Sequence, residues 1–235
     1  MRIGIIGAMD IEINALLSMM EDIDEQVISG ICFHSGKIHG VCVVAAVAGV
    51  GKVNAAVCAQ TMILKYAPDC LINVGVAGGL AKGLRVGDIV VAGSVVEHDM
   101  DTSPLGDEKG YITGLDRVYM ECDERISGIM YECAKKNPGI NVIKGIIASG
   151  DQFIASDEAR SRIINEFNAA AAEMEGASVG HVCAMNNVPF AVLRAMSDTA
   201  DNDAPVSFPE FAKRAAAVSV GIIEDMLKEL SEEEK

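Results

Sequence analysis

Runs of consecutive apolar residues that end in glycine, serine or aspartate limit the folds that this chain can adopt more than any other sequence feature. Runs of this kind are typical of strands buried on both faces of a sheet. They lie at 2–8, 41–48, 70–74, 88–96, 140–148 and 189–196. Apolar residues with helical spacing fill the intervals, at 10–20, 53–66, 123–136, 157–167, 173–186 and 209–230. This alternation of strands and helices predicts an α/β fold around one mostly parallel sheet.

The remaining segments add detail to this arrangement. Shorter segments near 27–33 and 37–39 predict an antiparallel hairpin inserted between the first two long strands. Pro209 suits the first turn of the last helix, because that turn leaves its N–H groups unpaired and proline has none. No linker or repeat divides the chain, so residues 1–235 are expected to fold as one domain.

The charge balance is strongly acidic and limits the partners. Lys and Arg number 19 against 34 Asp and Glu, which gives a net charge of −15. A surface of this kind repels phosphate backbones and anionic lipids, so neither a nucleic acid nor a membrane is an expected partner. It does not repel a neutral nucleoside.

The cysteines and the first residues of the chain predict a cytoplasmic protein. Seven cysteines occur, no CxxC pair is present, and most lie in apolar runs, as expected for buried thiols in a reducing compartment. Asp10 and Glu12 interrupt the apolar N-terminus too early for a signal peptide. No stretch reaches the roughly 18 apolar residues of a transmembrane helix.

Four segments that follow predicted strands are expected to meet. In open α/β sheets, ligands bind beyond the carboxyl ends of the strands. The four segments are 8–12, 75–79, 149–154 and 197–201, and each joins a strand to Gly, Ser or Asp. They therefore predict a single site.

Two glycine-rich motifs differ in what they predict. Gly49-Val50-Gly51-Lys52 is not a phosphate-binding loop, because Ala46 and Val53 stand where such a loop needs Gly and a hydroxyl residue. It is interpreted as a tight turn between a strand and a helix. The run from Gly75 to Gly79 ends in two adjacent glycines after a buried strand, which lets the backbone approach a flat ligand.

Carboxyl groups are the candidate catalytic groups, because neither a serine nucleophile motif nor a Cys/His catalytic signature occurs. Glu12 lies in the first turn of a predicted helix, where the helix dipole alone also favours an acid. Glu173 and Glu175 open another predicted helix, and residues two apart on a helix point about 200° apart. Only one of these two is therefore expected to face inward, where it would need a partner or a function.

Asp198 is placed at the carboxyl end of the last predicted strand. Capping the next turn would explain an aspartate there. Arg194, however, lies within the same apolar run, and a buried arginine near a strand-end acid predicts a charge arrangement that serves a ligand. The run His98-Asp99-Met100-Asp101 has no metal-ligand spacing, so no metal is expected.

Short motifs spread over nearly the whole chain, in order and with similar spacing, resemble the 5′-methylthioadenosine/S-adenosylhomocysteine nucleosidases. The motifs are Ile3-Gly4-Ile5-Ile6-Gly7-Ala8-Met9 with Glu12, Gly49-Val50-Gly51-Lys52-Val53, Asn73-Val74-Gly75 with Ala77-Gly78-Gly79-Leu80, Val86-Gly87-Asp88-Ile89-Val90, Ser149-Gly150-Asp151 with Phe153-Ile154, Glu173-Met174-Glu175, His181-Val182-Cys183 and Val192-Leu193-Arg194-Ala195-Met196-Ser197-Asp198.

The resemblance implies a nucleoside phosphorylase-like fold, with a central mixed sheet wrapped by helices. It implies a homodimer that needs no cofactor. The reaction implied is hydrolysis of methylthioadenosine or adenosylhomocysteine to adenine and the thioribose sugar, a step of methionine salvage.

The resemblance also assigns roles to residues. Asp198 would protonate adenine N7, Glu12 would orient the attacking water with Arg194 nearby, and Glu175 would hold the ribose hydroxyls. Met174 would pack under the sugar, Phe153 would stack on the base and the backbone of Ile154 would bind the adenine edge. The other substrate-binding positions are Met9, Val50, Ala77, Gly78 and Phe208, and Leu105 would cover the 5′ group of the partner subunit's substrate.

Two departures from the family pattern leave the preferred 5′ substituent open. Val76 stands where a hydroxyl residue is more usual. The segment 102–107 contains Asp107 where apolar or aromatic residues are usual. Three alternatives remain: a purine nucleoside phosphorylase, a futalosine-type hydrolase and a non-catalytic nucleoside-binding relative.

Overall fold

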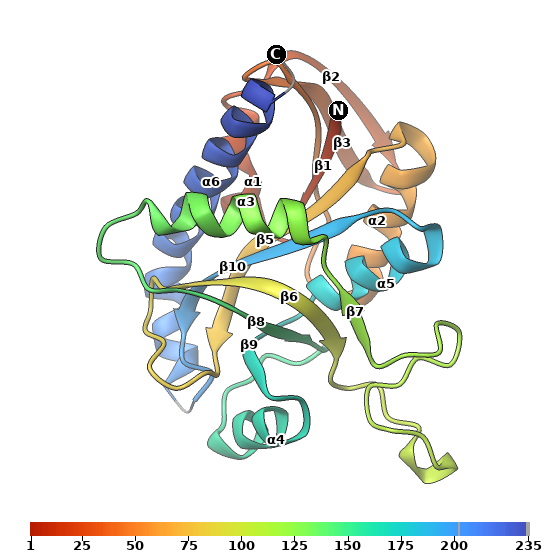
Figure 1. Cartoon of the computed structure of the whole chain (residues 1–235), viewed down its shortest axis with the longest axis vertical. Helices are drawn as coiled ribbons and strands as arrows, with labels where there is room; N and C mark the ends of the chain where they lie inside the picture. The colour runs from red at the N-terminus through yellow and green to blue at the C-terminus, as the bar shows by residue number, and fades with distance from the viewer. Residues whose placement is uncertain (202, 234–235) are drawn as a thin grey trace.

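The computed structural model describes residues 1–201 and 203–233, in which ten strands form one mixed sheet (Figure 1). The strands are β1 (Arg2–Gly7), β2 (Glu21–Ile28), β3 (Ile31–Ile38), β4 (Val41–Val47), β5 (Cys70–Gly79), β6 (Ile89–Glu97), β7 (Tyr119–Glu121), β8 (Val142–Ser149), β9 (Ala169–Glu173) and β10 (Phe190–Asp198). The predicted α/β class and the mixed sheet are confirmed.

The sheet closes on itself at one end. Its order is β10-β6-β8-β9-β5-β1-β4-β3-β2, and β10 also pairs with β5, so the five strands from β10 to β5 form a ring. The strands β1, β4, β3 and β2 extend outward from this ring and end at the edge strand β2, and the short strand β7 pairs with β6 outside this order. A closed ring leaves no exposed edge on those five strands.

Helices cover both faces of the sheet (Figure 1). They are α1 (Asp10–Leu17), α2 (Lys52–Tyr66), α3 (Glu124–Lys135), α4 (Asp157–Phe167), α5 (Gly176–Asn186) and α6 (Ala204–Glu233), with a short 3₁₀ turn, η1 (Ser103–Leu105). One core cluster joins α1, α3 and α6 to the sheet, and a second joins α2 and α5 to its other face. None of the described helices is long and apolar enough to cross a membrane.

Several predictions about the sheet are wrong in detail. Five of the ten strand pairings are parallel and five antiparallel, so the sheet is not mostly parallel. Strand β5 does not end at Val74 but continues through Gly79, because these glycines pair with β10 and β9. The strand β9 was not predicted, since its run of alanines carries no strand periodicity.

The hairpin and the last helix also differ from expectation. The hairpin turn lies at Ser29 and Gly30, both with positive φ, rather than between 33 and 37. Strand β2 is exposed along nearly its whole length, so burial gives it no apolar alternation. Helix α6 begins at Ala204, and Pro209 therefore lies inside it rather than in its first turn.

Candidate active site

A pocket of about 410 Å³ lies at the carboxyl ends of the central strands, a volume suited to a small organic ligand. All four segments that were expected to converge contribute to its wall, and Val50, Phe208 and the stretch around Met174 complete it. The lining comprises Ala8, Met9, Glu12, Val50, Val76, Ala77, Gly78, Gln152, Phe153, Ile154, Ala172, Glu173, Met174, Glu175, Ser197, Asp198, Ala200 and Phe208. A larger cavity between α3 and α4 contains none of the predicted catalytic carboxyl groups.

Glu12 is buried and fixed by three backbone donors. The N–H groups of Ala8 and Met9 donate to Oε2 at 2.8 and 3.0 Å, and that of Val76 donates to Oε1 at 3.1 Å. The bond from Met9 also caps α1, so the side chain closes the helix start while it lines the pocket. Burial raises the pKa of Glu12, although Arg194 and these N–H groups oppose the rise. A more basic carboxylate suits proton abstraction near neutral pH.

Two glycines of β5 make room for the acids. A Cβ at Gly75 would lie 2.6 Å from Oε1 of Glu12, and a Cβ at Gly78 would lie 2.8 Å from Oδ1 of Asp198. Both distances are shorter than real side chains allow, so any larger residue would displace a carboxylate. The glycine-rich run therefore lets the carboxylates of Glu12 and Asp198 approach the backbone of β5. The sequence alone predicted close approach only by a ligand.

Asp198 ends β10 and is also buried. The Ala200 N–H donates to its Oδ1 and the Ser197 hydroxyl to its Oδ2, both at 2.8 Å. Burial raises the pKa of Asp198, and the two hydrogen bonds only partly counter this. The group can therefore hold a proton more readily than an exposed aspartate.

Both Glu173 and Glu175 are buried, which corrects the expectation that only one faces inward. Glu173 ends β9, and Glu175 is the residue that precedes α5, so helical geometry does not separate them. Oxygens of Glu173 accept hydrogen bonds from the Ser149 hydroxyl, from the N–H groups of Glu175 and Gly176, and from the Arg194 guanidinium. Its lone pairs are thus engaged within the protein.

Glu175 is the less engaged of the two acids. Its Oε1 accepts one hydrogen bond, 2.8 Å long, from the Gly51 N–H. Burial, together with the neighbouring charge of Glu173, raises the pKa of Glu175 to about 7, against the opposing effect of Arg194. The turn at Gly51, predicted as a mere connection, therefore positions an acid of the pocket.

Arg194 lies in the middle of β10 and is 1% exposed. Its guanidinium donates to the backbone O and side-chain Oδ1 of Asn73 and forms an ion pair with Glu173. It does not line the pocket or hydrogen-bond to Glu12, but its charge lowers the pKa of both Glu12 and Glu175. Its influence on those two acids is electrostatic.

A charged network behind the pocket escaped prediction. The Lys52 amine lies 2.9 Å from Oε2 of Glu97 and 2.6 Å from Oδ1 of Asp99, and Nδ1 of His181 lies 2.8 Å from the other oxygen of Glu97. The Ser178 hydroxyl donates to the Lys52 carbonyl at 2.6 Å. The network holds the turn whose Gly51 N–H contacts Glu175.

Aromatic and aliphatic side chains form the rest of the wall. The rings of Phe153 and Phe208 meet edge to face, with centroids 5.5 Å apart. Phe153 is 48% exposed, so one of its surfaces is available to a ligand. Leu105 lies outside the pocket, on η1, and is 84% exposed. Asp107 accepts a hydrogen bond from the Thr102 hydroxyl, which accounts for this unexpected acid within its own loop.

The pocket is anionic and can stabilise a developing positive charge. Its lining has four carboxyl groups and, within the described part of the chain, no Lys, Arg or His. Such a site opposes a phosphate co-substrate and favours a cationic transition state. Gln152 and Ser197 belong to segments that were expected at the site, whereas Glu173 lines the pocket without having been given a role there. The buried Arg194 was a signal for Glu173, because a buried guanidinium needs an acidic partner.

Several known proteins are similar to this chain along nearly its whole length. The model of the phosphorylase superfamily matches residues 2–228. A 5′-methylthioadenosine/S-adenosylhomocysteine nucleosidase of Shewanella loihica is 39% identical over 98% of this chain and all of its own. The Neisseria meningitidis nucleosidase bound to methylthio-immucillin-A is 37% identical, with a TM-score of 0.94 over 97% of this chain and 99% of its own. A futalosine hydrolase of Helicobacter pylori is also 37% identical, with a TM-score of 0.92 over 97% of each chain.

Proposed function

Because this chain belongs to the 5′-methylthioadenosine/S-adenosylhomocysteine nucleosidase family of the phosphorylase superfamily, we propose that it hydrolyses the N-glycosidic bond of these two nucleosides. The products are adenine and either 5-methylthioribose or S-ribosylhomocysteine, which places the enzyme in methionine salvage. One observation carries the proposal: Glu12, Glu175 and Asp198 converge on one pocket whose described lining has no cation.

Asp198 is proposed as the general acid. Adenine leaves readily only when N7 is protonated, so the site needs a carboxyl group that still holds a proton near neutral pH. The raised pKa of the buried Asp198 supports this role. Phe153 and the backbone of Ile154 would hold the base, and Gly78 would let it approach the strand.

Glu12 and Glu175 are proposed to act at the sugar. Glu12 would orient and deprotonate the attacking water, and its three backbone donors keep the carboxylate in place without occupying every lone pair. Glu175 would accept hydrogen bonds from the ribose hydroxyls, with Met174 beneath the ring. Both carboxylates would stabilise the oxocarbenium-like charge that develops as the bond breaks. Met9, Val50, Ala77 and Phe208 would line the sugar and its 5′ substituent.

Arg194 is proposed to tune the protonation of Glu12 and Glu175 through its charge rather than to touch the substrate. Its hydrogen bonds fix Asn73 and Glu173, and its charge limits how far burial raises the pKa of Glu12 and Glu175.

Adenine release from 5′-methylthioadenosine, with and without inorganic phosphate, tests the proposal. We expect equal rates and a free sugar product, whereas phosphate dependence and a sugar 1-phosphate would show a phosphorylase. Asp198→Asn should slow release by about 10²–10⁴-fold, and the nearby exposed control Asp203→Asn should not. Tight binding of the nucleoside without adenine release over hours would instead show a binding protein.

A futalosine-type hydrolase is the second candidate, because the H. pylori futalosine hydrolase matches this chain about as well as the nucleosidases do. Such an enzyme would use the same acids on a larger 5′ group. A panel of methylthioadenosine, adenosylhomocysteine, 5′-deoxyadenosine and futalosine, compared by kcat/KM, separates the two. A preference of tenfold or more for futalosine would overturn the first assignment.

We also propose that the enzyme is a homodimer formed through α2 and α5. Val53, Val57 and Leu64 lie on one side of α2 and are 73%, 40% and 76% exposed, and Met185 on the adjacent α5 is 65% exposed. An apolar patch of this kind favours a protein partner. Leu105 of the partner subunit would then cover the 5′ end of the pocket.

Sedimentation tests the dimer. Val53→Glu should give a folded monomer with reduced activity, and Leu105→Asp should keep the dimer but raise KM for methylthioadenosine. A fully active Val53→Glu monomer would contradict the arrangement.

We expect the enzyme in the cytoplasm, where its seven free thiols, five of them buried, stay reduced.

A further inference from the structure

The β2–β3 hairpin carries a group of side chains that the proposed reaction does not use. Cys32 and His34 are two residues apart on β3, so they point to the same face of the sheet. Glu25 pairs directly with His34 across the hairpin. A thiol, an imidazole and a carboxylate thus share one face at the free edge of the sheet, and none of the three lines the pocket.

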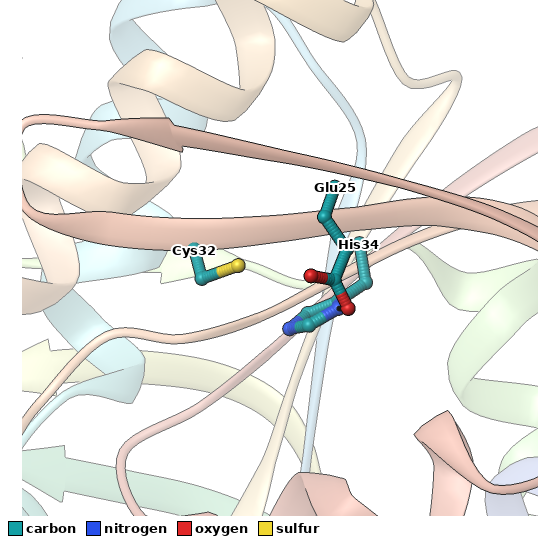
Figure 2. A group of neighbouring side chains, drawn as sticks. All are labelled: Glu25, Cys32 and His34. Atoms are coloured by element: carbon teal, nitrogen blue, oxygen red, sulfur yellow. Dashed lines mark ion pairs between the residues drawn. The ribbon is translucent and has the colours of Figure 1, made fainter.

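The side chains are close enough to share one ion. One ligand atom from each of Glu25, Cys32 and His34 lies within 4.8 Å of the other two (Figure 2). The Nδ1 atom of His34 is 3.2 Å from Oε1 of Glu25. Ligand atoms around a tetrahedral zinc ion lie roughly 3.3–3.8 Å apart, as follows from zinc–ligand distances of about 2.0–2.3 Å. Small side-chain rotations would bring the three atoms to these separations.

Access and charge also suit a metal. The Glu25 side chain is 63% exposed and the His34 side chain 17%, while Cys32 is half-buried, so an ion could enter from solvent and be partly sheltered. A thiolate and a carboxylate together balance the charge of a divalent cation. The mixture of S, N and O ligands favours zinc over Mg²⁺ or Ca²⁺, which prefer oxygen alone.

We propose that Glu25, Cys32 and His34 bind one zinc ion, with water in the fourth position. The ion joins the exposed edge strand β2 to β3, the only strand with which β2 pairs in the described sheet. Because the ion binds the folded hairpin, it stabilises the folded protein by an amount that grows with the logarithm of the free zinc concentration above the dissociation constant. This site is independent of the nucleosidase activity.

Cobalt(II) is a suitable probe, because a cobalt–thiolate bond gives charge-transfer absorption and a tetrahedral site gives intense visible bands. Titration of the full chain under reducing conditions should show both signals, saturating at one equivalent. Competition with a chromogenic chelator then gives the zinc affinity. Cys32→Ser should abolish the charge-transfer band, and His34→Ala and Glu25→Gln should each weaken zinc binding at least about tenfold.

Matched controls come from the same region. Cys42→Ser removes another half-buried thiol, on β4, and His39→Ala removes an exposed imidazole paired with Glu224. Both variants should bind zinc as the parent does. The proposal is overturned if the parent shows no thiolate band, or if Cys32→Ser binds zinc as tightly as Cys42→Ser. Thermal melts without metal establish that all variants are folded.

Discussion

Gly75→Ala is the substitution that most directly tests whether the position of Glu12 sets the rate. The added Cβ would lie 2.6 Å from Oε1 of Glu12, whereas ordinary contacts begin at 3.4 Å. The carboxylate oxygen must therefore move by about 0.8 Å, which breaks its hydrogen bond from the Val76 N–H. A misplacement near 1 Å can cost about 10²-fold in rate. We expect kcat to fall by about that factor, or about 2.7 kcal/mol in barrier height.

The assay is adenine release under saturating and limiting methylthioadenosine. KM should change little, because the displaced oxygen is proposed to contact water rather than substrate. Gly93→Ala is the matched control, since Gly93 also lies in a strand and a Cβ there meets nothing within 4 Å. It should keep the parent kcat, and melting curves of both variants check that the fold is intact.

A double-mutant cycle identifies the cause. If Gly75→Ala acts by displacing Glu12, it should cost almost nothing further in a Glu12→Gln background. A folded Gly75→Ala enzyme with near-parent kcat would refute the reasoning, as would full additivity with Glu12→Gln.

Three further predictions concern the charged groups around the pocket. The pKa of Glu175 is about 7, above its ordinary value of 4.5, so the folded state retains a proton that the unfolded state has lost between these pH values. The free energy of unfolding should therefore fall as pH rises through this window. Urea titrations at several pH values should show a weaker pH dependence for Glu175→Gln, whereas the exposed control Glu121→Gln should keep that of the parent. Arg194→Met leaves Glu173 buried without its cation and should lower the free energy of unfolding by about 3–5 kcal/mol. Adding Glu173→Gln should recover part of this loss. A urea unfolding midpoint equal to that of the parent would contradict the role of the ion pair. Lys52→Met should loosen the turn at Gly51, so that adenine release shows a KM raised several-fold and a smaller change in kcat. The control Lys65→Met, at an exposed position of the same helix, should leave both constants unchanged. A change in kcat alone would argue against this positioning role.

Much of the site could be predicted because strand ends are easy to recognise in a sequence. Glu12 and Asp198 each follow a continuous apolar run, and the carboxyl ends of such strands gather at one side of the sheet. The α/β class followed from the alternation of apolar runs with helical spacing. The resemblance of the motifs then assigned roles that composition and spacing could not.

Two of the errors in the central sheet share one cause, which is pairing between segments distant in the chain. Glu173 was placed on a helix because the alanines before it carry no strand signal, yet β8 and β5 pair with that segment and make it a strand. The glycines after Val74 were expected to lie beyond the end of a strand, yet β10 pairs along them and extends β5. Local propensity does not contain these pairings.

The fold class, the buried strands and the acids at their ends can be recognised in the sequence, because burial on both faces and the exits from strands leave local patterns. Which acid remains free for a ligand depends on the folded arrangement. Arg194 binds Glu173, whereas Glu175 accepts a single hydrogen bond, from the Gly51 N–H. The contact between Arg194 and Glu173 depends on the ring of strands, which brings β10, β5 and β9 together. Hydrogen bonds and burial between distant segments set that choice, and they exist only once the ring has closed.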